Sequence, residues 1–110
     1  MDVAGDLAYY LAEWYLPEMT TTSVDEMVAK LDAAAASVSS AGTPVRLVVT
    51  LSVPTDEVLY GVFGAPSSDI VSTTCLQAGV PYQRLSGDVG ARIQQPPVVT
   101  LPMATATQCD

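Results

Sequence analysis

The sequence predicts an α+β fold of the ferredoxin-like type, βαββαβ, with a four-stranded antiparallel sheet and two helices on one face. The segments follow the order strand, helix, strand, strand, helix, strand, with period-2 alternation in the strands and three-and-four apolar spacing in the helices. The length of 110 residues suits one compact domain. We expect a single domain over residues 1–93, followed by a proline- and threonine-rich tail over residues 94–110.

The first predicted strand covers residues 7–16, LAYYLAEWYL, which are rich in Tyr, Trp and Leu and are followed by Pro17. Both of its faces are mostly apolar, so we expect the strand to be covered on both sides. The alternation leaves open which face is turned to the helices, because a slip of one residue exchanges the two sets of side chains.

The first helix is expected to begin at Ser23, where SVDE has the form of a capping box between Ser23 and Glu26. Gly42 and Pro44 end this helix. Its apolar stripe consists of Val24, Met27, Val28, Leu31, Ala35 and Val38.

A hairpin follows, with strands over residues 45–53 and 57–65 joined by a turn over residues 54–56. Ser67 or Ser68 then caps a short second helix. The last strand is expected over residues 82–93, and its glycines indicate a bulge or a sheet edge.

The composition excludes several functional classes. The chain has 12 acidic and 4 basic residues, no histidine, and a formal charge of −8. The scattered basic residues form no phosphate-neutralising patch, so we do not expect nucleic acid or an anionic membrane surface as a partner. No apolar stretch approaches the roughly 20 residues of a membrane span, and the start lacks a basic signal region, so we expect a cytoplasmic protein.

An excess of apolar over charged residues suggests contact with another subunit. Hydrophobic residues make up 49% of the chain and charged residues only 15%. If the sheet face without helices is apolar, it should pair with a second sheet, and we expect a homodimer, although another protein would serve equally well. The alternation allows this uncovered face to carry Tyr10, Trp14, Val48, Leu59 and Phe63.

Three segments carry a family resemblance: AYYLAEWYLP, the hairpin VRLVVTLSVPTDEVLYGVFGAP, and GAPSSDIV followed by QAGVPYQRL. Over residues 8–93 they resemble a family of small single-domain proteins of unknown function that includes a nickel-binding, nickel-responsive bacterial protein. The resemblance implies a ferredoxin-like fold and association into dimers or larger assemblies. Borderline metals such as nickel favour nitrogen donors, and histidine is absent, so we expect neither a metal site nor a cofactor.

The lack of histidine also removes the usual general base and the common nucleophile pairs. Glu13 is the candidate acid or base, because it interrupts an apolar strand face, with Tyr15 beside it as a second catalytic candidate. The alternative is that Glu13 faces solvent or forms an ion pair with Arg46 or Arg84.

A ligand site is a further hypothesis. Arg46 lies on the less apolar side of its strand with Thr50 and Ser52, where it is placed to bind a carboxylate or to face solvent. The aromatic side chains either wall a pocket for a small apolar ligand or form core and interface packing. The candidate ligand-binding residues are Arg46, Tyr10, Trp14, Tyr60 and Phe63.

These observations predict a module that self-associates and binds a small ligand or a partner protein. Two alternatives stay open. One is a metal- and cofactor-independent dimeric α+β barrel enzyme, of monooxygenase or isomerase type, that uses a buried carboxylate. The other is a structural subunit of a larger assembly, attached through the tail.

Overall fold

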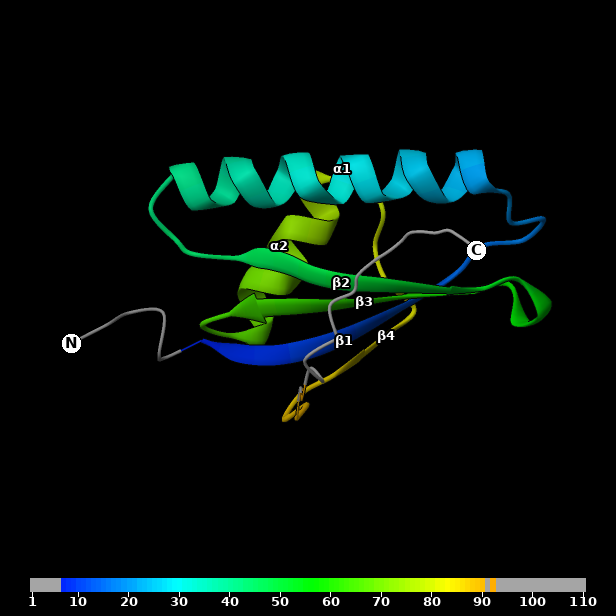
Figure 1. Ribbon diagram of the computed structural model, residues 1–110. Helices are drawn as coiled ribbons and strands as arrows, with labels where there is room; N and C mark the ends of the chain where they lie inside the picture. Colours follow the sequence, from blue (N-terminus) through cyan, green and yellow to red (C-terminus); the bar gives the residue numbers. More distant parts are fainter. Residues whose placement is uncertain (1–6, 91, 93–110) are drawn as a thin grey trace, which may run out of the picture.

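The structure, a computed structural model, describes residues 7–90 and Arg92. It contains a four-stranded antiparallel sheet in the order β2-β3-β1-β4, with both helices on one side (Figure 1). The predicted ferredoxin-like fold class is therefore confirmed. The predicted tail over residues 94–110 lies outside the described residues. The elements are β1 (Ala8–Tyr15), α1 (Thr21–Ser40), β2 (Arg46–Val53), the 3-10 helix η2 (Pro54–Asp56), β3 (Val58–Ala65), α2 (Ser68–Gln77) and β4 (Arg84–Ser86).

The central pair of strands, β1 and β3, determines which side chains lie under the helices. In their register Tyr10 is opposite Phe63, and Trp14 is opposite Leu59. Trp14 is 3% exposed, while Leu59 and Phe63 are fully buried. The uncovered face predicted from Tyr10, Trp14, Leu59 and Phe63 is therefore wrong, because these residues form the helix-covered face.

The indole of Trp14 gives a physical reason for this choice of face. Its Nε1–H donates a 2.7 Å hydrogen bond to the carbonyl oxygen of Val80, just beyond α2. Its ring also meets Phe63 edge to face, with centroids 6.4 Å apart. The opposite side of β1 carries Glu13 and Tyr15, whose polar groups require water or polar partners. Within one chain, the helices cover only one side of β1, whereas the sequence predicted that both sides of this strand are covered.

Helix α1 begins earlier than predicted. The N-cap is Thr20, whose hydroxyl accepts a hydrogen bond from the Ser23 backbone N–H at 3.0 Å. The Ser23 hydroxyl accepts one from the Thr20 N–H at 2.9 Å. The expected box between Ser23 and Glu26 is therefore wrong, because Thr20 is the residue with extended backbone and Ser23 already lies in the first turn. The predicted stripe is confirmed at Met27, Leu31 and Ala35, which are buried.

The two edge strands are both irregular. Strand β2 has a register shift between Leu47 and Val49, so Val48, predicted on the uncovered face, lies at a bulge and is half-buried. Within the described residues, strand β4 covers only Arg84–Ser86 of the strand predicted over residues 82–93, of which 91 and 93 lie outside the description. The Gln83 and Val89 N–H groups on either side also donate to β1, to the carbonyls of Glu13 and Tyr9. The left-handed backbone of Asp88, with φ of 53°, interrupts the extended conformation soon after β4.

Candidate functional site

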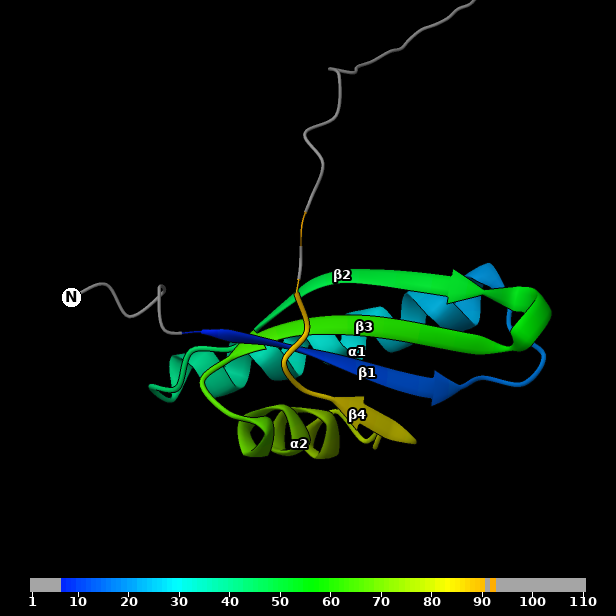
Figure 2. The same ribbon diagram turned by 90° about the horizontal axis from the view of Figure 1, so that it is seen from below.

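The sheet side without helices, which we call the open face, is the main candidate site. Figure 2 views the molecule with this face toward the reader. Four of the five large hydrophobic side chains exposed in the described residues lie there, namely Tyr9, Tyr15, Val49 and Leu51. The register assigns to the open face Tyr9, Leu11, Glu13 and Tyr15 of β1, Arg46, Val49, Leu51 and Val53 of β2, Val58, Tyr60, Val62 and Gly64 of β3, and Arg84 and Ser86 of β4.

A polar group interrupts this apolar face. Glu13 is opposite Tyr60 on one side and opposite Arg84 on the other. The Arg84 Nε lies 3.7 Å from the Glu13 Oε2, and the side chains are 72% and 24% exposed, respectively. The sequence left open whether Glu13 pairs with Arg46 or Arg84, and the structure shows Arg84. Because Arg84 is so exposed, this ion pair adds little stability by itself.

The predicted catalytic partner Tyr15 has a different contact. Its hydroxyl donates a 3.0 Å hydrogen bond to the Oε1 of Glu57. The other carboxylate oxygen accepts a 2.9 Å hydrogen bond from the Glu18 backbone N–H, and the Leu16 N–H donates to the Glu57 carbonyl at 2.7 Å. These bonds tie the end of β1 to the β2–β3 turn. We call Tyr15, Glu18 and Glu57 with their hydrogen bonds the carboxylate clamp.

The clamp changes the acidity of both side chains. The backbone N–H of Glu18, followed by the Tyr15 hydroxyl, lowers the pKa of Glu57 below its ordinary value. The hydrogen bond to Glu57 and its negative charge raise the pKa of Tyr15. Tyr15 is thus held as a protonated donor. Glu57 was not predicted as a site residue, because no local sequence pattern indicates that its partner Tyr15 lies 42 positions away along the chain.

The other predicted ligand residues are divided between the two faces. Tyr60 lies beside Glu13 on the open face, and Arg46 lies at the far end of the same face. Trp14 and Phe63 belong to the core, and Tyr10 packs against it. The predicted aromatic pocket is therefore wrong as one group, because the alternation of the strands separates its members.

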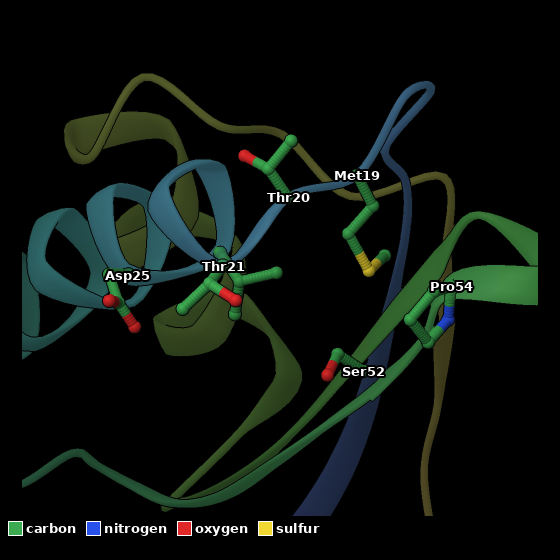
Figure 3. A pocket seen from close by; sticks show the side chains of 7 residues that line it. Met19, Thr20, Thr21, Asp25, Ser52 and Pro54 are labelled. Atoms are coloured by element: carbon green, nitrogen blue, oxygen red, sulfur yellow. The ribbon is translucent and has the colours of Figure 1, made fainter.

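A cleft of about 460 Å³ lies between the start of α1 and the β2–β3 hairpin (Figure 3). It contains none of the predicted site residues. Its one carboxylate is that of Asp25, and the Thr20 hydroxyl is already used to cap the helix. The residues lining it are Met19, Thr20, Thr21, Val24, Asp25, Ser52 and Pro54.

A smaller cavity of about 220 Å³ lies against Cys75, beside Ser72 and Tyr82. The Cys75 thiol is free and buried, and burial raises its pKa to about 12. The thiol is therefore protonated at neutral pH and is a poor nucleophile.

Residues 7–90 and 92 include no group of three or more His, Cys, Asp or Glu side chains able to hold a metal ion. In the same part of the chain, no helix has the length and apolar character needed to cross a membrane.

Comparison with known proteins supports the fold. Neither a family model nor a curated protein matches this sequence. The crystal structure of SCO4226 from Streptomyces coelicolor A3(2) is similar, with a TM-score of 0.66 and 14% sequence identity. The match covers 76% of this chain and 100% of that chain. At this identity the similarity shows a shared fold alone, and the resemblance to the nickel-responsive family stays a prediction.

Proposed function

We propose that this protein is a self-associating module in which two copies pack through their open faces and enclose a small-ligand site. The observation that supports the proposal is the exposure of large apolar side chains on this face. Tyr15 and Leu51 are 56% and 57% exposed, and Val49 is 42% exposed. Water contact with such a group is unfavourable, so a covering partner would stabilise the protein.

The size of the open face is compatible with this function. Strands β1, β2 and β3 have eight residues each. At roughly 3.3 Å per residue and 4.8 Å between strands, they outline about 400 Å², and side-chain relief increases the accessible area. The largest apolar patch on a typical monomer has a similar area and is often functional. Packing of two such sheets face to face is a common arrangement.

The ligand part of the proposal rests on Glu13, Tyr60 and Arg84. A second copy over the open face would remove these side chains from water, and buried polar groups need hydrogen-bond partners. Glu13 and Arg84 partly satisfy one another at 3.7 Å. A small molecule with an apolar body and one polar group would pair with the donors and acceptors that remain.

The association is tested with a matched pair of substitutions. Leu51→Lys places a charge on the open face, whereas Leu76→Lys makes the same change on α2 at a similar exposure of 65%. We expect wild type and Leu76→Lys to sediment as dimers at micromolar concentration. Leu51→Lys should weaken the dimer by roughly tenfold or more, because the new charge must lose water on association. A monomeric wild type would overturn the proposal.

The ligand site is tested separately by native mass spectrometry of the purified dimer. We expect bound small molecules to be retained by wild type and lost from Glu13→Gln, with the dimer intact in both. Equal retention in the two proteins would remove Glu13 from the site.

The same position of Glu13 supports a second candidate function. In a dimer, a carboxylate between a phenol and a guanidinium would be enclosed, as an acid or base in a metal-independent barrel enzyme requires. Loss of turnover in Glu13→Gln, with ligand binding retained, would favour this enzyme over a binding module. Tyr15 is less suited to take part, because its hydroxyl is engaged by Glu57.

A further inference from the structure

On the β2–β3 side of the open face, Arg46 lies at one end and carboxylates lie at the other. Asp88 adjoins the first end at the far edge of the sheet, since the neighbouring Val89 N–H donates to the Tyr9 carbonyl. At one end Arg46 is opposite Gly64, and a Cβ on Gly64 would lie 3.7 Å both from the Arg46 side chain and from the Tyr9 ring. At the other end, where Val53 is opposite Val58, the adjoining turns carry Glu18, Asp56 and Glu57. We call this second group the acidic end.

The rows between these ends are largely apolar. Leu11, Val62 and Val49 form one row across three strands, and Tyr60 and Leu51 continue the next row from Glu13. Seven residues along a strand separate Arg46 from Val53, which corresponds to about 23 Å. This separation exceeds the screening length of roughly 8 Å at physiological salt, so the two ends act independently.

Neither end is neutralised within the described part of one chain. Arg46 is exposed and forms no ion pair there, since the one ion pair found joins Arg84 to Glu13. The Glu57 carboxylate is bound by the Tyr15 hydroxyl and the Glu18 backbone N–H, neither of which carries a positive charge. The chain has only 4 basic residues against 12 acidic ones, and two of the four, Arg46 and Arg84, lie on the open face.

Of the ways in which a two-fold axis can pack the open faces of two copies, two keep the strands of the two sheets aligned. The two-fold axis lies between the sheets and runs either along the strands or across them. An axis along the strands brings the acidic end of one copy toward the acidic end of the other, which is repulsive. An axis across the strands makes facing strands antiparallel and brings Arg46 of each copy over the acidic end of the other.

We infer, on the basis of the proposed self-association, that the occupant of the open face is a second copy whose strands run antiparallel to the first. Arg46 of each copy then pairs with the acidic end of the other, so the contact occurs twice in the dimer. Arg46 sets the orientation of the interface, and the apolar rows supply most of its burial.

The first test compares two substitutions that change the charge equally. Arg46→Glu reverses the charge on the open face, and Lys30→Glu does so on α1, which covers the other side of the sheet. We expect Arg46→Glu to weaken the dimer by roughly ten- to hundredfold at low salt, because two attractions become two repulsions. Lys30→Glu should change the dimer constant by less than about threefold under the same conditions. Sedimentation at low and high salt measures both, and circular dichroism checks that both variants fold.

The second test restores the attraction in a mixture. The double variant Glu18→Lys, Asp56→Lys reverses most of the acidic end and leaves Glu57 in the carboxylate clamp. By itself this variant should also dimerise weakly, since its Arg46 would face lysines. Mixed with Arg46→Glu, it should form a heterodimer of near wild-type affinity, because both contacts again join opposite charges.

The outcomes separate this inference from the proposed function. A wild-type monomer overturns both. Suppose that wild type is a dimer, that Leu51→Lys weakens it, and that Arg46→Glu weakens it no more than Lys30→Glu does. This result keeps the proposed function and overturns the antiparallel arrangement. Weak association of Arg46→Glu, together with recovery of the dimer in the mixture, supports the antiparallel arrangement.

Discussion

Gly61 on β3 has no side chain at the place where the Trp14 ring lies. A Cβ on Gly61 would be 3.0 Å from one ring carbon of Trp14 and 3.4 Å from the Leu47 Cδ1. The first distance is shorter than van der Waals contact. The absence of a Cβ at Gly61 therefore leaves room for the Trp14 ring, the largest side chain of the core.

This close approach predicts that Gly61→Ala destabilises the protein. We expect the free energy of unfolding to fall by about 1–3 kcal/mol, because the ring must shift in a packed core. Gly64→Ala on the same strand is the control, since its nearest neighbours would be 3.7 Å away. That change should be neutral or stabilising by up to about 1 kcal/mol, as glycine disfavours a strand. Urea unfolding of the two variants at equal concentration measures the difference, and equal losses would contradict the proposed crowding at Trp14.

The carboxylate clamp predicts a dependence of stability on pH. The pKa of Glu57 is lowered in the folded protein, first by the Glu18 N–H and then by the Tyr15 hydroxyl. Its contribution is therefore present above the ordinary pKa of a glutamate and is lost as pH falls through the folded pKa. We expect wild type to lose more stability than Glu57→Gln between about pH 5 and about pH 3. If wild type and Glu57→Gln lost stability equally over this range, the clamp would not couple stability to the protonation of Glu57.

The contribution of the Tyr15 hydroxyl to stability depends on pH in the opposite direction. Its pKa is raised by Glu57, so its contribution is complete below the ordinary tyrosine pKa and is lost as pH rises through the folded value. Ultraviolet titration should therefore show that one tyrosine ionises at lower pH in Glu57→Gln than in wild type.

At the scale of elements, the start of α1 shows how a cap selects one helix boundary among several. Thr20, Thr21, Thr22 and Ser23 all have hydroxyls, but only Thr20 has the extended backbone of an N-cap. Its reciprocal hydrogen bonds with Ser23 satisfy two backbone donors that the helix leaves free.

We therefore predict unequal effects from two neighbouring threonine substitutions. Thr20→Ala should lower the free energy of unfolding by about 1 kcal/mol, because it removes the cap acceptor. Thr22→Ala should be neutral or slightly stabilising, since this residue is exposed in the first turn and alanine is the better helix former. Thermal unfolding of both variants tests the boundary, and a larger effect at Thr22 would place the cap elsewhere.

At the scale of the whole molecule, an apolar open face should couple folding to association. If two copies pack through it, dimer formation favours the folded state by mass action, and the melting temperature rises with protein concentration. We expect this rise in wild type and in Leu76→Lys, and a much flatter dependence in Leu51→Lys. Differential scanning calorimetry over a hundredfold range of concentration measures it, and a constant wild-type melting temperature would argue against coupled association.

The elements were largely predictable because their signals are local. Period-2 alternation predicted β2 and β3 to within one residue, and the serines before Asp69 predicted the start of α2. The site was only partly predictable. Glu13 and Tyr60 do lie side by side, whereas Trp14 and Phe63 belong to the core. The sequence alone did not distinguish these two groups, because both faces of β1 are rich in aromatic and aliphatic side chains.

The amino-acid sequence by itself determined the order and type of the elements and the excess of acidic charge, since these depend on neighbouring residues and on composition. The tertiary structure decided which face of the sheet the helices cover. That choice depends on contacts across the chain, such as the bond from Trp14 to Val80 and the fit of its ring against Gly61. It also decided the partners of Glu13 and Glu57, because only the folded sheet brings Arg84 and Tyr15 beside them.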